Sequence, residues 1–195
     1  PRMPALFVGH GNPMNAIEKN EFHLSWGELG ARLPRPRGIL CVSAHWETAD
    51  LRVTAAERPE TIHDFYGFPR ALFEVDYPAP GDPALARRVR ELIRGDGAGP
   101  GAVANVETDG AVDVALDTRR GFDHGAWSVL IAMYPRADIP VVQLSLASRR
   151  PPASHYALGR KLAPLRDEGV LVVGSGNVVH NLALWDARAG GPDDW

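Results

Sequence analysis

The sequence has very little cysteine, because Cys41 is the only one among 195 residues. A single cysteine cannot form an internal disulfide or a thiolate cage around a metal ion, so both kinds of site are excluded within the chain. Cys41 lies in the apolar run GILCVS at residues 38–43, and we therefore expect a buried core thiol. This cysteine usage also favours a reducing, cytoplasmic location.

Long apolar runs and an excess of basic charge are missing as well. No run approaches the roughly 20 residues that a helix needs to span a bilayer, so we expect no membrane partner. The formal net charge is −3, which gives no broad basic surface, and we expect no nucleic-acid partner. Hydrophobic residues make up 45% of the chain and charged residues 23%, as is usual for a packed globular domain.

Short apolar runs alternate with helical stretches along the chain. The apolar runs predict strands at 5–9, 38–43, 51–56, 139–146 and 170–174. Periodicity and capping residues predict helices at 83–94, 126–134 and 153–167, with a kink or early end at Pro164 in the last. The stretch GDGAGPG at 95–101 predicts a surface loop. Together these elements predict a single α/β domain with a mostly parallel central sheet flanked by helices.

Three histidines follow predicted strands. His10, His45 and His180 each come shortly after an apolar run, and glycines flank His10 and precede His180. Ligands bind at the carboxyl ends of strands in open α/β sheets, and neutral imidazole is a common ligand of iron, zinc and copper. A lone histidine after a strand is usually a surface or capping residue, but three at equivalent strand ends favour a metal site there.

Two further histidines are candidates for other roles. His124 follows Asp123, a residue that can orient its ring or raise its pKa, and a histidine so placed is a candidate general acid or base. A capping or core role at the start of the 126–134 helix explains His124 equally well. His63 lies in an aromatic, turn-rich segment at 61–69, as in a substrate-facing loop, and a simply packed loop is the alternative.

Six motifs occur in an order that resembles one enzyme family. They are GHGNPMN at 9–15, SAHW at 43–46, TIHDFYGFP at 61–69, YPAPG at 77–81, GFDHGAW at 121–127 and GNVVHNL at 176–182. The chain resembles, over nearly its whole length, the class III extradiol ring-cleaving dioxygenases of the LigB-like superfamily, in particular the bacterial 4,5-DOPA extradiol dioxygenases. This resemblance implies an α/β fold with a mononuclear metal centre that opens catechol rings.

The resemblance also implies roles for individual residues. His10 and His45 match metal ligands, and His124 matches a histidine that faces the substrate. His180 matches a metal ligand of similar enzymes and an acid/base of distant ones, so both roles stay open. The family has a further C-terminal region with another metal-binding residue, which the sequence to Trp195 does not contain. We therefore expect residues 1–195 to form a single catalytic domain that lacks its C-terminal portion and binds metal weakly.

The activity implied is that of an extradiol dioxygenase, which inserts O₂ into a catechol ring. A DOPA-like substrate, cleaved at the 4,5-bond to a seco-DOPA semialdehyde, is expected. Fe(II) is the cofactor expected for activity, and Zn(II) can occupy such a site without redox change. A zinc-dependent hydrolase and a non-enzymatic binding protein on the same fold are the alternatives. The expected partners are the catechol and O₂, and the sequence leaves a homo-oligomer open.

Overall fold

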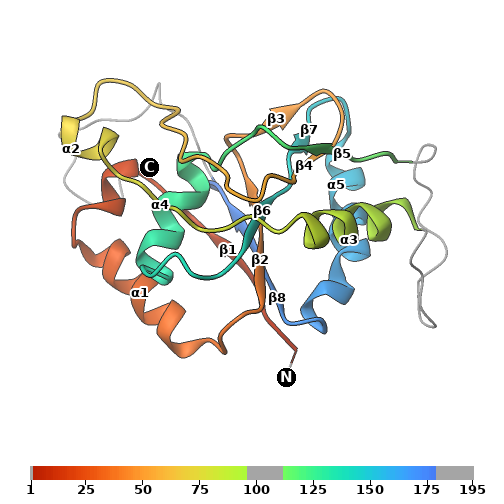
Figure 1. The fold of residues 1–195 in the computed structure, drawn as a ribbon, viewed down its shortest axis with the longest axis horizontal. Helices are drawn as coiled ribbons and strands as arrows, with labels where there is room; N and C mark the ends of the chain where they lie inside the picture. The colour runs from red at the N-terminus through yellow and green to blue at the C-terminus, as the bar shows by residue number, and fades with distance from the viewer. Residues whose placement is uncertain (1, 96–111, 179–195) are drawn as a thin grey trace.

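The computed structural model describes residues 2–95 and 112–178, and its centre is a parallel sheet of four strands in the order β1-β8-β2-β6 (Figure 1). These strands are β1 (Ala5–Val8), β2 (Gly38–Ser43), β6 (Val141–Gln143) and β8 (Val170–Ser175). Every pairing between them is parallel, which places all four carboxyl ends at one edge. The predicted α/β class is confirmed. The predicted strands at 5–9, 38–43 and 170–174 agree with β1, β2 and β8 to within one residue at each end.

Helices cover both faces of this sheet (Figure 1). Those on one face are α1 (Glu21–Arg32) and α4 (His124–Met133), and those on the other are α3 (Pro83–Arg94) and α5 (Pro152–Lys161). Side chains alternate between the two faces along a strand. Ile39 accordingly belongs to one buried cluster with Trp127 of α4, and Leu40 to a second cluster with Val89 of α3. Burial on both sides explains why β2 is apolar throughout.

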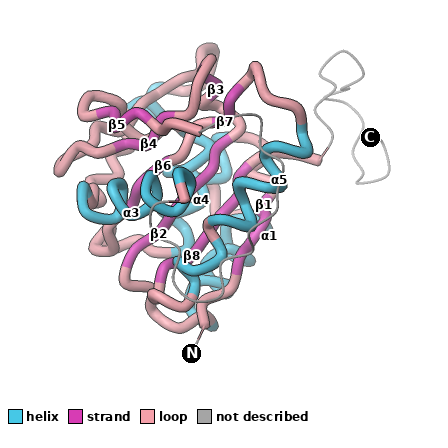
Figure 2. The backbone as a smooth tube through the Cα atoms, turned by 90° about the vertical axis from the view of Figure 1, so that its right-hand side faces the viewer, coloured by secondary structure: helices cyan, strands magenta, loops and turns pink. Residues whose placement is uncertain are grey.

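Two pairs of short parallel strands complete the strand pattern. They are β3 (Glu47–Thr48) with β7 (Leu146–Ala147), and β4 (Arg52–Thr54) with β5 (Ala115–Asp117). Figures 1 and 2 both place these pairs at the end of the molecule opposite the N-terminus. The predicted strand at 139–146 is therefore wrong in length. The chain leaves the central sheet after Gln143, and its next strand, β7, pairs with β3.

The predicted helices are present with altered ends. Asp82 caps α3, accepting hydrogen bonds from the backbone of Ala84 and Leu85, as its position before Pro83 predicted. The stretch predicted as one helix at 153–167 is divided. Here α5 ends at Lys161, and a 3₁₀ turn, η2 (Ala163–Arg166), contains Pro164. Proline removes a helical hydrogen bond and clashes with the preceding turn, so the early end follows.

The start of α4 differs from the prediction by two residues. The helix begins at His124 instead of Ala126, because the carboxylate of Asp123 caps it and accepts a hydrogen bond from the backbone of Ala126. No helix among residues 2–95 and 112–178 is long and apolar enough to cross a membrane. The predicted glycine-rich loop lies, after Gly95, outside the described residues.

Candidate metal centre

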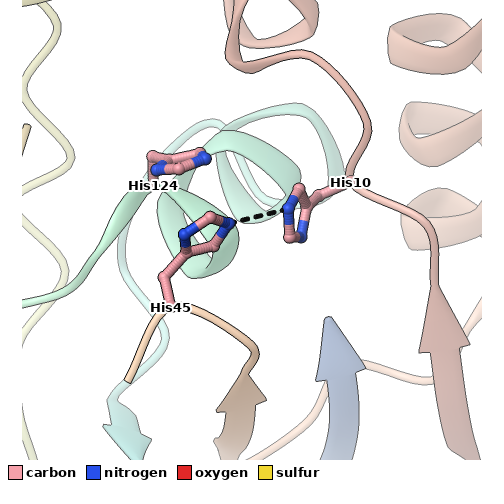
Figure 3. Close-up of side chains that lie close together, drawn as sticks. All are labelled: His10, His45 and His124. Carbon is pink, nitrogen blue, oxygen red and sulfur yellow. Dashed lines mark hydrogen bonds between the residues drawn. The ribbon is translucent and has the colours of Figure 1, made fainter. Parts of the chain in front are cut away.

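Three histidine rings meet beyond the carboxyl edge of the sheet (Figure 3). His10 follows β1, His45 follows β2, and His124 is the first residue of α4. One ring nitrogen from each lies within 4.8 Å of the others. The Nε2 atoms of His10 and His45 are 3.0 Å apart, and the ring centroids of His45 and His124 are 3.9 Å apart. His10 and His124 are buried, and His45 is half-buried.

The ends of the central strands provide the residues that hold these rings. Ser43 and Ser175, the last residues of β2 and β8, lie opposite each other in the register of the two strands. Gln143 ends β6 and is fully buried. Because parallel strands bring their carboxyl ends together, polar residues far apart in the sequence meet here beside the histidines.

Ser175 fixes the protonation of His10. Its Oγ donates its single hydrogen to the carbonyl oxygen of Gly125, and it lies 3.0 Å from Nδ1 of His10. A hydroxyl that has used its hydrogen can only accept, so the proton of His10 must sit on Nδ1. Nε2 of His10 then presents a lone pair towards His45.

Asp64 contacts the other two histidines. Its Oδ1 accepts hydrogen bonds of 2.9 Å from Nδ1 and from the backbone N–H of His124, and its Oδ2 lies 3.6 Å from Nδ1 of His45. Burial opposes ionisation of this carboxyl, but the hydrogen bonds and charge of His124 outweigh it and lower the pKa of Asp64 to about 2. An ionised carboxylate can only accept, so His124 carries its proton on Nδ1.

Asp123 supports the backbone of the site instead of a ring. Its carboxylate accepts hydrogen bonds from Ser43 Oγ at 2.6 Å and from Gln143 Nε2 at 2.8 Å. Ser43 Oγ in turn accepts a 3.1 Å hydrogen bond from the backbone N–H of His45. The expectation that Asp123 contacts the ring of His124 is therefore wrong, because capping α4 turns its carboxylate towards the strand ends.

The arrangement suits a divalent metal ion. Protonation of His10 on Nδ1 leaves its Nε2 lone pair facing Nε2 of His45 across 3.0 Å, where a cation, or a proton on His45, would satisfy it. With metal–nitrogen bonds of about 2.1 Å and an N–metal–N angle of about 90–109°, the two ligand nitrogens would be roughly 3.0–3.4 Å apart. Hydrogen bonds from the outer ring nitrogens to Ser175 and Asp64 are of the kind that orient metal-binding histidines.

An aromatic wall lies beside His124. The ring of Phe65 packs edge-on against His124 with centroids 5.5 Å apart, and it also contacts Phe68, Phe73 and Trp127. His63 is part of this wall, and its Nε2 lies 3.0 Å from the carbonyl oxygen of Val75. The structure thus places His63 in the aromatic wall and not among the three clustered histidines.

Some residues of the site were not identified from the sequence. His180, predicted as a ligand or acid/base, lies outside the described residues. Asp64, Ser43, Ser175 and Gln143 were not predicted to have a role. The neighbouring histidine in the 61–69 motif drew attention to that segment, but no local pattern indicates that its aspartate reaches a ring 60 residues further along the chain.

Known proteins are similar to this chain in sequence. The family described as the catalytic LigB subunit of aromatic ring-opening dioxygenase matches residues 3–192. A protein of Escherichia coli K12 named 4,5-DOPA dioxygenase extradiol is 56% identical over 182 residues, covering 93% of this chain and 61% of that protein. A protein of the same name from Beta vulgaris is 45% identical, covering 90% of this chain and 62% of that protein.

A solved structure is also similar. The crystal structure of an uncharacterized protein from Escherichia coli K12 superposes with a TM-score of 0.75 at 49% identity, covering 96% of this chain and 65% of that one. The chain thus spans about three fifths of the length of the curated relatives it matches, at 61% and 62%.

Proposed function

We propose that this chain, which belongs to the LigB family of aromatic ring-opening dioxygenases, carries the metal centre of an extradiol dioxygenase that inserts O₂ into a catechol ring. The observation that supports the proposal best is the convergence of His10, His45 and His124 at the carboxyl edge of a parallel sheet. Strand ends are where α/β proteins bind ligands, and a histidine cluster there can hold a catalytic ion.

We assign His10 and His45 as metal ligands. Their Nε2 atoms are already at a separation that suits one ion, and their outer nitrogens face Ser175 and Asp64. His180 remains our candidate for a third ligand or for an acid/base beside the ion. Fe(II), when bound, would supply the redox chemistry that lets a catechol react with O₂, whereas Zn(II) can occupy the site without it.

His124 is assigned as the acid/base that faces the substrate. Asp64 holds its Nδ1 proton, so the opposite nitrogen can accept the proton of a catechol hydroxyl and later return it. The negative charge of Asp64, 2.9 Å away, stabilises the imidazolium that forms in between. His63 is predicted to bind substrate. Because its Nε2 lies against the carbonyl oxygen of Val75, it would affect the bound substrate through the aromatic side chains that surround it.

The substrate proposed is a DOPA-like catechol, opened at the 4,5-bond to a seco-DOPA semialdehyde. Two of the relatives are named as 4,5-DOPA extradiol dioxygenases. In this chain the edge of Phe65 beside His124 offers an aromatic surface against which a catechol ring can pack. A cytoplasmic setting suits the single, buried thiol of Cys41.

The decisive experiment measures oxygen uptake with L-DOPA and simple catechols after loading the full-length protein with Fe(II) or Zn(II). A dioxygenase consumes one O₂ per ring opened with Fe(II) and none with Zn(II), and the semialdehyde is seen by its absorbance and mass. His10→Ala should abolish uptake. Hydrolysis with Zn(II) and no oxygen uptake would indicate a hydrolase instead, and catechol binding without turnover would indicate a binding protein.

A further inference from the structure

Asp64 contacts two of the three histidines with one carboxylate. Oδ1 accepts both the ring Nδ1–H and the backbone N–H of His124, each at 2.9 Å. Oδ2 lies 3.6 Å from Nδ1 of His45, too long for a hydrogen bond but close enough for an electrostatic interaction. The side chain of Asp64 is 22% exposed, so water weakens these interactions only partly.

The segment that carries Asp64 is fixed to the start of α4 by several hydrogen bonds. The backbone of Ile62 donates to the carbonyl oxygen of Phe122 at 2.7 Å, and its own carbonyl accepts from Trp127 Nε1 at 2.8 Å. Gly121 allows the two segments to approach closely, since a Cβ there would collide with the carbonyl group of Glu60. The carboxylate is therefore held in place by its own backbone.

We propose that Asp64 is a positioning residue for two histidines: its Oδ1 binds Nδ1–H of His124, and its Oδ2 keeps the Nδ1 side of His45 turned towards it, so that Nε2 of each ring is directed into the site. This inference rests on the proposed function in assigning that site to a metal ion and a substrate. Residues that bind the outer nitrogen of a ligating histidine fix its tautomer and orientation. Here one carboxylate would do so for a ligand and for the acid/base at once.

Asp123 cannot take this role, although it is adjacent to His124 in the sequence. Its two oxygens bind Ser43 and Gln143, and one of them also caps α4. It acts on His45 only through the backbone, because the Ser43 hydroxyl that it binds accepts the N–H of His45. Among the described residues, Asp64 is the carboxylate with oxygens beside the rings of His45 and His124.

Two substitutions separate the proposal from a general loss of charge. Asp64→Ala removes both acceptors. Asp64→Asn keeps one acceptor and replaces the other by an N–H₂ donor, which favours a bare Nδ1 and a protonated Nε2 on the histidine it faces. Asp76→Asn is the matched control, because this carboxylate lies further along the same connection, is exposed, and binds Thr61 Oγ1 at 2.8 Å.

The first measurement is the tautomer of each ring in the metal-free protein, read from the ¹⁵N shifts in two-bond ¹H–¹⁵N spectra. The second is Zn(II) affinity in competition with a chelator. We expect an Nδ1–H ring for His124 in the wild type and in Asp76→Asn. In Asp64→Ala, which lacks the acceptor, the ring of His124 should populate the Nε2–H form, and Zn(II) affinity should fall about 10–100-fold in both Asp64 variants.

The inference is overturned if His124 stays entirely Nδ1–H in folded Asp64→Ala, or if Zn(II) affinity changes less than about threefold in both Asp64 variants. Circular dichroism is the check that all variants are folded. The proposed function fails separately, if the full-length wild-type protein loaded with Fe(II) takes up no O₂ with any catechol. A change of histidine tautomer in the Asp64 variants would support the inference even then.

Discussion

Ser43 and Ser175 are register partners at the carboxyl ends of β2 and β8, and each holds a different histidine. Ser175 Oγ lies 3.0 Å from Nδ1 of His10, and Ser43 Oγ accepts the backbone N–H of His45 at 3.1 Å. Because the two serines are paired in the register, the two candidate ligands are held at the same level along the strand direction. Precision at the site comes from the sheet, because side chains held by strand ends are placed more precisely than side chains on loops.

Replacing Ser175 by alanine should weaken metal binding. The variant loses the acceptor that keeps the proton of His10 on Nδ1, so we expect Zn(II) affinity to fall about 10–100-fold. The free energy of unfolding should fall by only about 1 kcal/mol, the usual contribution of one hydrogen bond. Chelator competition and urea titration measure the two effects. Ser25→Ala, on the exposed side of α1, is the control, and equal Zn(II) affinity in the two variants would contradict the prediction.

Substitution of Gly125 should also disturb the site. A Cβ at this position would collide with Ser43 Oγ and lie 2.9 Å from Cδ2 of His45. Gly125→Ala should therefore push His45 out of place, lowering Zn(II) affinity at least tenfold and the unfolding free energy by about 1–3 kcal/mol. Gly159→Ala in α5, where a Cβ meets nothing within 4 Å, is the matched control and should leave both unchanged or slightly improved. Full Zn(II) affinity in Gly125→Ala would show that the ring can shift without loss.

His124→Ala should separate the acid/base from the metal ligands. If His10 and His45 hold the ion, the variant keeps nearly all of its Fe(II), while turnover of a catechol falls by roughly 10²–10⁴-fold, the usual contribution of a general acid or base. Metal analysis after gel filtration and oxygen uptake measure the two quantities. His155→Ala is the control, because this histidine of α5 binds the backbone N–H of Ala147 and is not one of the three clustered rings. Loss of the ion in His124→Ala would make His124 a ligand instead.

The family, the fold class and the meeting of His10 and His45 could be predicted because their signals are local. Apolar runs such as GILCVS mark strands buried on both faces, and a histidine just after such a run must lie at the carboxyl edge. The resemblance carried by the ordered motifs is confirmed by the family match over residues 3–192. The roles assigned to the individual histidines stay predictions.

The supporting residues could not be predicted, because their contacts are not local. Asp64 meets His124 only when the loop that carries it packs against the start of α4, 60 residues away. Ser43 and Ser175 look like ordinary strand residues until the order β1-β8-β2-β6 brings them together. Asp123 was a reasonable candidate from its position before His124, but helix capping uses its carboxylate first.

Cys41 should be unreactive in the folded protein. It is 1% exposed in β2, and burial, together with the negative charge of Asp123, raises the pKa of its thiol far above the ordinary value. Since the thiolate is the reactive form, Ellman's reagent should label less than about a tenth of the protein at neutral pH and one thiol per chain in guanidinium chloride. Rapid, complete labelling of the native protein would show that β2 opens readily.

Two glycines of α1 should respond to alanine in opposite directions. Gly30 lies against α4 so closely that a Cβ would collide with the carbonyl of Met133 and lie 2.9 Å from its Cα. Gly30→Ala should separate the two helices and lower the unfolding free energy by about 1–3 kcal/mol. At Gly27, one turn earlier, a Cβ would be 3.5 Å from the Ala132 carbonyl oxygen, an ordinary contact. Gly27→Ala should therefore gain up to about 1 kcal/mol from helix propensity. Urea titrations measure the unfolding free energy of both variants. Equal changes in that free energy would mean that α1 and α4 can move apart without cost.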